Sequence, residues 1–237
     1  MISKEPYTIT EIIKETPDVN IFRLKSQDNA TLDFDPGMFI MLYYKDPSTS
    51  QEIGRAYSLA SRPGSDTLEL YISMVHGRFT SKLDTAKVGD IYYVSGPYGQ
   101  FRFDPKKNRK VLFIAGGTGI APFMSMLRHI KEKGFDIDAV LIYSVRYPTE
   151  IIRKSELEDF ARSIGLKLVV TVTRPQQGDN WTGETGHINE EMVKRHVADL
   201  TERDCYVCGP LNFTNAMKAV LSNLGIESAK VKADVWG

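Results

Sequence analysis

The stretch Val111–Pro122, VLFIAGGTGIAP, holds the residues best suited to binding chemistry. Five apolar residues predict a buried strand, three glycines in four positions predict a turn, and Pro122 stands where a helix would begin. Glycine lets phosphate groups approach bare backbone, and a helix N-terminus offers unpaired N–H groups with a positive dipole end. The pattern is neither G-x-G-x-x-G nor a P-loop. It predicts a nucleotide phosphate site, with a tight structural turn as the alternative.

A second candidate is residues 55–61, RAYSLAS. On a strand, Arg55, Tyr57 and Leu59 share one face, while Ser58 points to the other. A guanidinium pairs with phosphate and a phenol packs against a flat ring, so this face suits an anionic, planar ligand. A surface arginine over a half-buried tyrosine is the alternative.

A third candidate is Gly77–Ser81, GRFTS, at the start of a short helix predicted at Thr80–Lys87. A glycine followed by hydroxyl residues suits a phosphate group, and it equally suits a plain helix cap. The segment Gly96–Phe101, GPYGQF, predicts a structural turn.

The elements that position these residues change in rhythm near the polar stretch Asp104–Arg109. Before it, runs of β-branched and aromatic residues alternate with Pro/Gly turns, which favours an antiparallel barrel or sandwich. The strands expected there are Tyr7–Lys14, Val19–Leu24, Phe39–Tyr44, Arg55–Ser61, Leu68–Met74 and Ile91–Ser95.

After that stretch, strands and helices alternate, which predicts a parallel sheet with helices on both faces and ligands at the carboxyl ends of the strands. The expected strands are Val111–Ala115, Ala139–Ser144, Lys167–Thr173, Asp204–Cys208 and Ala229–Trp236. The expected helices are Ala121–Lys133, Lys154–Ile164, Asn189–His196 and Leu211–Leu224. An apolar stripe on the last helix, which includes Phe213, is assigned to the core.

Composition excludes several classes of protein. The 237 residues balance 30 basic against 30 acidic side chains, unlike a dedicated nucleic-acid binder. No apolar run is long enough to insert into a membrane and the first residues lack a signal-peptide core, so we expect a soluble, cytoplasmic protein. Two cysteines cannot supply an iron–sulfur cluster, and Cys205 and Cys208 would point to opposite faces of a strand. The four histidines show no metal-ligand spacing.

Five motifs together resemble the ferredoxin–NADP reductase superfamily, and the resemblance covers essentially the whole chain. They are Arg55-Ala56-Tyr57-Ser58, Gly77-x-x-Thr80, Gly96-Pro97-Tyr98-Gly99-x-Phe101, Gly116-Gly117-Thr118-Gly119-Ile120-Ala121-Pro122 and Cys208-Gly209-Pro210. The resemblance implies a β plus α/β protein of two domains: an antiparallel six-stranded FAD-binding barrel over residues 1–106 and a five-stranded parallel-sheet NAD(P)-binding domain over residues 107–237.

The resemblance also implies roles for individual residues. Ser58 near flavin N5, Cys208 beside the nicotinamide and Trp236 over the flavin face would take part in catalysis. Asp234-Val235-Trp236 differs from the family's usual ending by an Asp in place of Glu and by one extra residue, Gly237. The residues implicated in cofactor binding are Arg55, Ala56, Tyr57, Ser58, Tyr71, Gly77, Arg78, Phe79, Thr80, Ser81, Gly117, Thr118, Gly119, Pro122, Ser144, Arg146, Arg153, Thr173, Arg174, Cys208, Gly209, Pro210 and Trp236.

Charge placement bears on the choice of nicotinamide coenzyme. A 2′-phosphate needs cations after the second or third parallel strand, where Arg146, Arg153 and Arg174 stand. No acidic residue directly ends the second strand, although Glu150 lies nearby and could engage an unphosphorylated ribose. NADPH is therefore favoured over NADH.

The expected function is a flavoprotein reductase that passes hydride from NAD(P)H to FAD and then electrons to a separate acceptor. FAD rather than FMN follows from family habit alone. The acceptor could be a ferredoxin, a flavodoxin, an oxygenase component or a small molecule. One alternative is a flavin-carrying subunit that relays electrons within a larger complex, and another is a flavin-free NAD(P)-binding domain.

Overall fold

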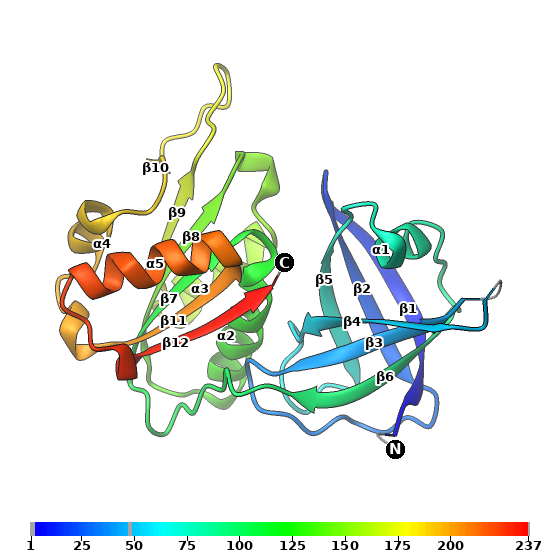
Figure 1. Ribbon diagram of the computed structural model, residues 1–237. Coiled ribbons are helices and arrows are strands. Elements are labelled where there is room, and N and C mark those ends of the chain that lie inside the picture. The colour runs from blue at the N-terminus through cyan, green and yellow to red at the C-terminus, as the bar shows by residue number, and fades with distance from the viewer. Residues whose placement is uncertain (1–2, 47–48, 237) are drawn as a thin grey trace. The chain divides into compact units, whose positions relative to one another are not determined.

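Residues 3–46 and 49–236 are described by a computed structural model, with the side chain of Trp236 left out. The chain divides into two compact units after Phe103, and the first unit also includes Met124–His129. The boundary at 106/107 remains our prediction for the domain division. Figure 1 labels the elements along the chain.

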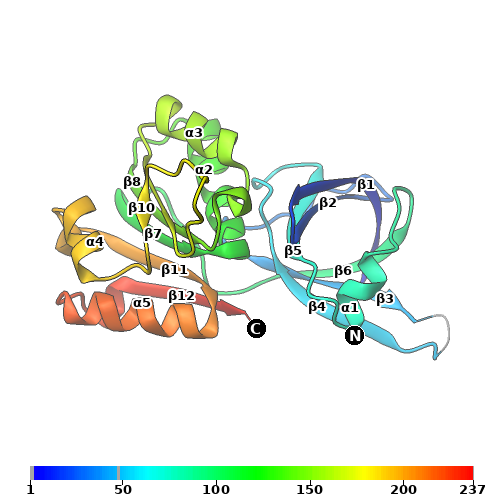
Figure 2. The same ribbon diagram turned by 90° about the horizontal axis from the view of Figure 1, so that it is seen from above.

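The first unit is built from six antiparallel strands and one short helix. The strands are β1 (Glu5–Thr16), β2 (Val19–Ser26), β3 (Phe39–Lys45), β4 (Glu52–Ser58), β5 (Thr67–Ser73) and β6 (Ile91–Tyr98), and the helix is α1 (Arg78–Leu83). The sheet order is β4-β3-β6-β1-β2-β5. Just beyond β4, the N–H of Ala60 donates to the carbonyl of Glu69 on β5 at 2.9 Å, which brings the two edge strands together. Figure 2 shows the strands surrounding a common interior.

Alternation with period two explains the core of this barrel. Ile40, Leu42 and Tyr44 on β3 are buried, while the residues between them are more exposed. Strand β4 begins three residues earlier than the sequence predicts and ends at Ser58. Helix α1 likewise begins at Arg78 rather than Thr80, because the extended residue Gly77 already serves as its N-cap.

The second unit is a parallel sheet in the order β10-β9-β8-β7-β11-β12. Its strands are β7 (Lys110–Gly116), β8 (Asp138–Val145), β9 (Lys167–Val172), β10 (Glu184–Thr185), β11 (Asp204–Pro210) and β12 (Val231–Trp236). Helices α2 (Ala121–Lys133) and α3 (Lys154–Ser163) cover one face and α4 (Glu190–His196) and α5 (Leu211–Asn223) the other, as Figure 2 shows. Short 3₁₀ turns are η1 (Gly117–Ile120), η2 (Pro148–Glu150), η3 (Leu200–Glu202) and η4 (Ser228–Lys230).

The predicted fold class is confirmed, with one addition to the parallel sheet. The sheet has a sixth strand, the two-residue β10, which pairs with the end of β9. Two residues are too short to show a periodic pattern, so sequence reasoning did not find this strand. At its end the Thr171 hydroxyl donates to the carbonyl of Gly186 at 2.7 Å.

The order of strands locates the functional edge of the sheet. From β7 the chain proceeds to β8 on one side, and later to β11 on the other side. In open α/β sheets the crevice outside the carboxyl ends of two such strands is the usual ligand site. The carboxyl ends of β7 and β11 are Gly116 and the segment Cys208–Pro210.

Candidate functional site

The glycine turn after β7 rests directly against β11. A Cβ on Gly119 would lie 2.3 Å from the carbonyl oxygen of Cys208 and 2.8 Å from the nitrogen of Gly209, so only glycine fits there. Gly117 has φ +55°, and a Cβ on it would meet no atom within 4 Å. The turn therefore combines one glycine required for packing with one whose backbone faces open space, which is a cradle suited to a phosphate group.

Phe213 is a component of this edge that sequence reasoning assigned to the core. Gly116 and Gly209 face each other on β7 and β11, and their added Cβ atoms would lie 3.0 Å and 2.6 Å from the Phe213 ring. The ring is half-buried and covers both glycines. Its position three residues after Pro210 was the available signal, since this places it in the first turn of α5.

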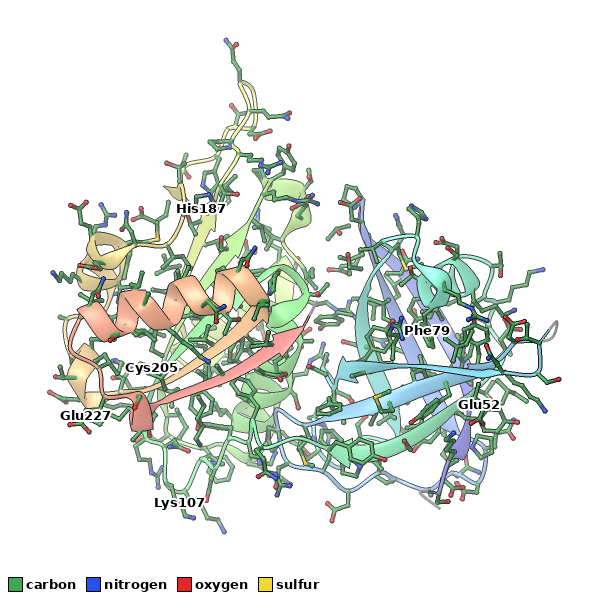
Figure 3. All side chains as sticks on the ribbon, viewed as in Figure 1. Glu52, Phe79, Lys107, His187, Cys205 and Glu227 are labelled. Atoms are coloured by element: carbon green, nitrogen blue, oxygen red, sulfur yellow. The ribbon has the colours of Figure 1, made fainter. Side chains whose placement is uncertain are left out.

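The segment Cys208–Pro210 carries backbone rather than reactive side chains. Burial raises the pKa of the Cys208 thiol well above its usual range, so the sulfur stays protonated and neutral. Its carbonyl is in contact distance of the glycine turn, and the Thr214 hydroxyl donates to the carbonyl of Gly209 at 3.2 Å. Cys205 is also buried, and neither cysteine forms a disulfide. Figure 3 shows Cys205 within this unit, with Lys107 and Glu227 at its periphery.

Arginines gather at the neighbouring strand ends. The N–H of Arg174 donates to the carbonyl of Arg146 at 2.9 Å, so the two residues lie side by side after β9 and β8. Arg146 forms two hydrogen bonds to the Glu150 carboxylate, at 2.6 Å and 3.1 Å. Arg153 has φ +52° and precedes α3. Glu150 thus pairs with Arg146, a residue that we expected to be available to a 2′-phosphate.

Three further residues predicted for this unit lie close to the same edge. Ser144 is the penultimate residue of β8, and Thr173 directly follows β9. The N–H of Thr173 donates to the carbonyl of Val145 at 2.9 Å. Pro122 is buried at the start of α2. Thr118 is half-buried within η1.

In the barrel, Arg55 and Tyr57 differ in burial. Arg55 is exposed and donates to the carbonyl of Gly54 at 2.9 Å. Tyr57 is half-buried and packs on Phe79, with ring centroids 5.9 Å apart. Burial raises the pKa of Tyr57, and the nearby positive charge of Arg55 opposes this rise to a smaller extent. Phe79 belongs to α1, and its side chain is buried in the core of the first unit (Figure 3). The exposed Ala56 and half-buried Ser58 complete this end of β4.

The glycine loop before α1 also presents open backbone. A Cβ on Gly77 would meet only the Thr80 hydroxyl oxygen, at 3.9 Å. The Thr80 hydroxyl is turned inward and donates to the carbonyl of Gly77 at 3.2 Å, so it does not cap α1, which has no side-chain cap hydrogen bond. Ser81 is exposed, and Arg78 reaches Asp46 at 3.2 Å.

Tyr71 belongs to a buried charge cluster that the sequence did not reveal. Its hydroxyl donates to the Glu69 carboxylate at 3.1 Å. Arg23 and Arg128, both within the first unit, each donate to the same carboxylate at 2.8 Å. A buried carboxylate needs such partners, so this cluster has a structural explanation.

Two predictions concern the last strand, β12, and its final residue, Trp236. The side chain of Trp236 lies outside the described residues, while its backbone pairs with Pro210. Strand β12 begins two residues later than predicted, and Val235 is 43% exposed although it stands on the expected apolar face.

Within residues 3–46 and 49–236, no group of three or more His, Cys, Asp or Glu side chains could hold a metal ion. No helix in that part of the chain is both long and apolar enough to cross a membrane.

Comparison with known proteins assigns each unit to a domain type. Residues 6–103 match the family model of the oxidoreductase FAD-binding domain, and residues 113–219 match that of the oxidoreductase NAD-binding domain.

Three relatives illustrate the similarity. The glycine betaine monooxygenase reductase subunit of Pseudomonas aeruginosa is 31% identical over 96% of this chain, and the chain spans 63% of that relative's length. NADH-cytochrome b5 reductase 1 of Aspergillus clavatus is 30% identical, covering 92% of this chain and 75% of the relative. The solved ferredoxin reductase in carbazole 1,9a-dioxygenase is 27% identical with a TM-score of 0.86, covering 100% of this chain and 70% of that chain.

Proposed function

The chain belongs to the ferredoxin–NADP reductase superfamily, and from this membership we propose that it is a flavoprotein reductase. It takes hydride from NADPH or NADH onto FAD and delivers electrons to a separate acceptor. The observation that carries the proposal is the glycine turn at Gly116–Gly119, which lies against Cys208–Gly209 at the switch point of a parallel sheet.

The barrel residues fit a bound flavin dinucleotide. Open backbone at Gly77 and the exposed guanidinium of Arg55 suit its phosphates, and Tyr57 supported by Phe79 offers a phenol face for its ring. Bound FAD would supply the hydride acceptor and release electrons one or two at a time. The protein's contribution is then binding and orientation, so the neutral, buried Cys208 thiol needs no acid–base role.

The residues of the second unit fit a nicotinamide dinucleotide. Gly117, Thr118 and Gly119 would receive its pyrophosphate, and Cys208 and Gly209 would lie beside the nicotinamide. Ser58 and Trp236 keep their proposed roles at the flavin, on family resemblance alone.

NADPH is the favoured electron donor in this proposal. Among the described residues, the exposed Arg174 has no side-chain partner, so its charge is available for a 2′-phosphate. Arg146 is held by Glu150 and would have to exchange this carboxylate for the phosphate. NADH remains the alternative donor, because Glu150 could accept from the hydroxyls of an unphosphorylated ribose.

An oxygenase component is the favoured acceptor. A monooxygenase reductase subunit and a dioxygenase ferredoxin reductase are among the similar proteins, and each is similar over nearly the whole of this chain. A ferredoxin, a flavodoxin or a small molecule would use the same two sites. We also propose a cytoplasmic setting, where nicotinamide coenzymes are reduced and replenished.

Rapid mixing of the FAD-loaded protein with NADPH or NADH tests the proposal. We expect the flavin absorption to bleach, faster with NADPH. Arg174→Gln should weaken NADPH binding about 10-fold and leave NADH unchanged, since one charge-assisted contact is lost. Arg162→Gln, an exposed arginine in the last turn of α3, is the control. Absence of bleaching by either nucleotide would favour a subunit whose flavin is reduced by a partner, and failure to bind flavin would favour a flavin-free domain.

A further inference from the structure

One buried hydroxyl contacts two separate segments of the proposed coenzyme site. Tyr143 lies on β8 and is fully buried. Its hydroxyl donates to the carbonyl oxygen of Gly117 at 3.1 Å, and the hydroxyl oxygen accepts from the N–H of Ile152 at 3.5 Å. Gly117 is the second residue of the glycine turn Gly116–Gly119, whereas Ile152 lies between Glu150 and Arg153. A single side chain therefore joins the turn to the segment that carries charge at the end of β8.

The bond to Gly117 sets the direction of a peptide group. In a trans peptide the C=O and the following N–H point to opposite sides. Because the Gly117 carbonyl is held toward the buried Tyr143, the N–H of Thr118 points away from the sheet interior. Gly117 has φ +55°, a conformation open mainly to glycine, and a Cβ on it would meet no atom within 4 Å, so side-chain packing at this residue does not set the orientation.

The segment Glu150–Arg153 also has a backbone conformation that requires support from a neighbouring group. Ile151 and Ile152 are buried, and Arg153 then adopts a left-handed conformation that is unfavourable for a residue other than glycine. Glu150, directly before them, pairs with Arg146. The position of Ile152 thus influences where the Glu150 carboxylate and the Arg153 backbone lie.

We propose that Tyr143 is a positioning residue that couples the pyrophosphate turn to the segment that recognises the coenzyme's 2′ substituent. The inference rests on the proposed function, namely that this unit binds a nicotinamide dinucleotide. Packing does not explain the hydroxyl, because a phenylalanine would fill the same space without a buried polar atom that requires partners. The tyrosine directly follows an otherwise aliphatic run, Ala139–Ile142.

The parallel sheet supplies a matched control. Tyr206 on β11 is also fully buried, and its hydroxyl donates to the Asn108 side chain at 3.1 Å and accepts from Lys232 at 3.0 Å. These contacts belong to the amino-terminal side of the sheet, away from the glycine turn. Tyr206→Phe therefore removes an equivalent hydroxyl outside the proposed site.

The first experiment measures NADP⁺ and NAD⁺ dissociation constants of the FAD-loaded full chain by calorimetry. Tyr143→Phe should weaken both about 5- to 10-fold, the scale of one lost buried hydrogen bond. Tyr206→Phe should leave both unchanged, while thermal unfolding without nucleotide should shift similarly in the two variants. Binding by Tyr143→Phe equal to that of the parent would overturn the inference. A parent that binds neither nucleotide would instead refute the proposed function.

The second experiment tests coupling, which a merely stabilising residue would not show. Glu150→Gln is combined with Tyr143→Phe, and the ratio of NAD⁺ to NADP⁺ dissociation constants is compared across the four proteins. We expect the Glu150→Gln effect on this ratio to differ about 3-fold or more between the two backgrounds, since contacting networks are not additive. Equal effects in both backgrounds would show that the two segments act independently, which contradicts the proposal. The same cycle with Tyr206→Phe should be additive.

Discussion

The two ends of the strands in the parallel sheet differ in the residues that hold them. We call the side on which the strands begin the amino edge and the side on which they end the carboxyl edge. At the amino edge, the buried Arg203 bonds to the carboxylates of Asp199 and Asp138 at 2.7 Å each and to the carbonyl of Asp138 at 2.9 Å. Lys110 adds a bond to Asp199 at 3.1 Å. At the carboxyl edge, β7 ends in Gly116 and leads into the glycine turn, where Gly119 lies directly against Cys208 and Gly117 faces open space.

This difference gives the two edges different roles: the amino edge stabilises the fold, and the carboxyl edge binds a ligand. Charges at the amino edge are satisfied by one another, so they hold the strand ends together and leave little for a ligand. The glycine turn at the carboxyl edge opens the 3₁₀ turn η1, which has no side-chain cap, and an anion can accept from the first N–H groups of such a turn. Changes at the amino edge should therefore alter stability, and changes at the carboxyl edge should alter nucleotide binding.

The largest expected effect is on the amino edge. Arg203→Met should lower the free energy of unfolding by about 3 kcal/mol, because it removes the buried partner of the Asp199 and Asp138 carboxylates and of the Asp138 carbonyl. Denaturant unfolding measures the loss, and the NADP⁺ dissociation constant of the folded protein should stay unchanged. Arg195→Met, which removes an exposed pair to Glu184, is the control and should cost less than about 1 kcal/mol. Weakened NADP⁺ binding by Arg203→Met would break the division between the edges.

The next effect is on the carboxyl edge. Gly119→Ala places a Cβ within 2.3 Å of the Cys208 carbonyl, so either the turn or the end of β11 must move. We expect kcat/KM for NADPH to fall about 100-fold, the scale of a misplacement by about 1 Å. Steady-state kinetics measure the change.

Gly134→Ala is the control for this change. Gly134 ends α2 at φ +65°, and a Cβ there meets no atom within 4 Å. It should cost about 1 kcal/mol of stability with kcat/KM unchanged. Equal losses of activity in the two variants would mean that the contact with Cys208 is not what the turn requires.

The smallest expected effect is the pH dependence of the free energy of unfolding that Asp199 at the amino edge contributes. Hydrogen bonding to Arg203 lowers the pKa of Asp199 from 3.8 to about 2, and Lys110 contributes in the same direction. A carboxylate with a lowered folded pKa stabilises the protein above its unfolded pKa, and that contribution is lost as pH falls between about 4 and 2. Asp199 is partly exposed, so solvent screening should keep the effect below about 1 kcal/mol.

Unfolding measured from pH 6 to pH 2 would test this. Asp199→Asn should be less stable than the parent at pH 6, and the difference should narrow toward pH 2. Glu158→Gln, an exposed residue of α3, should run parallel to the parent. An Asp199→Asn curve parallel to that of the parent would show that this carboxylate does not contribute.

The sequence predicted best where the signal is local. Strand, glycine turn and Pro122 are contiguous, so the architecture of the β7–α2 connection follows from the residue types alone. Strand β10 was missed because it has two residues and exists through its pairing with β9. Glu150 was recognised as near Arg146, but its bidentate contact depends on the course of η2.

The sequence patterns could not predict contacts between side chains from distant segments. The apolar stripe of α5 correctly suggested burial, yet it could not show that Phe213 covers Gly116 and Gly209. Tyr143 stands within a buried strand, and only the fold brings its hydroxyl to Gly117. In the cluster of Glu69 with Arg23 and Arg128, the bonded residues lie 46 and 59 positions apart in the chain.

By itself, the sequence determined the two-domain class, the order of its elements and the glycine turn, because periodicity and backbone preference act between neighbouring residues. The tertiary structure alone decided which glycines contact a neighbouring strand, which arginine is already paired and which hydroxyl supports the turn. Those outcomes depend on contacts between residues far apart in the chain, and contact is a property of the folded backbone rather than of residue type.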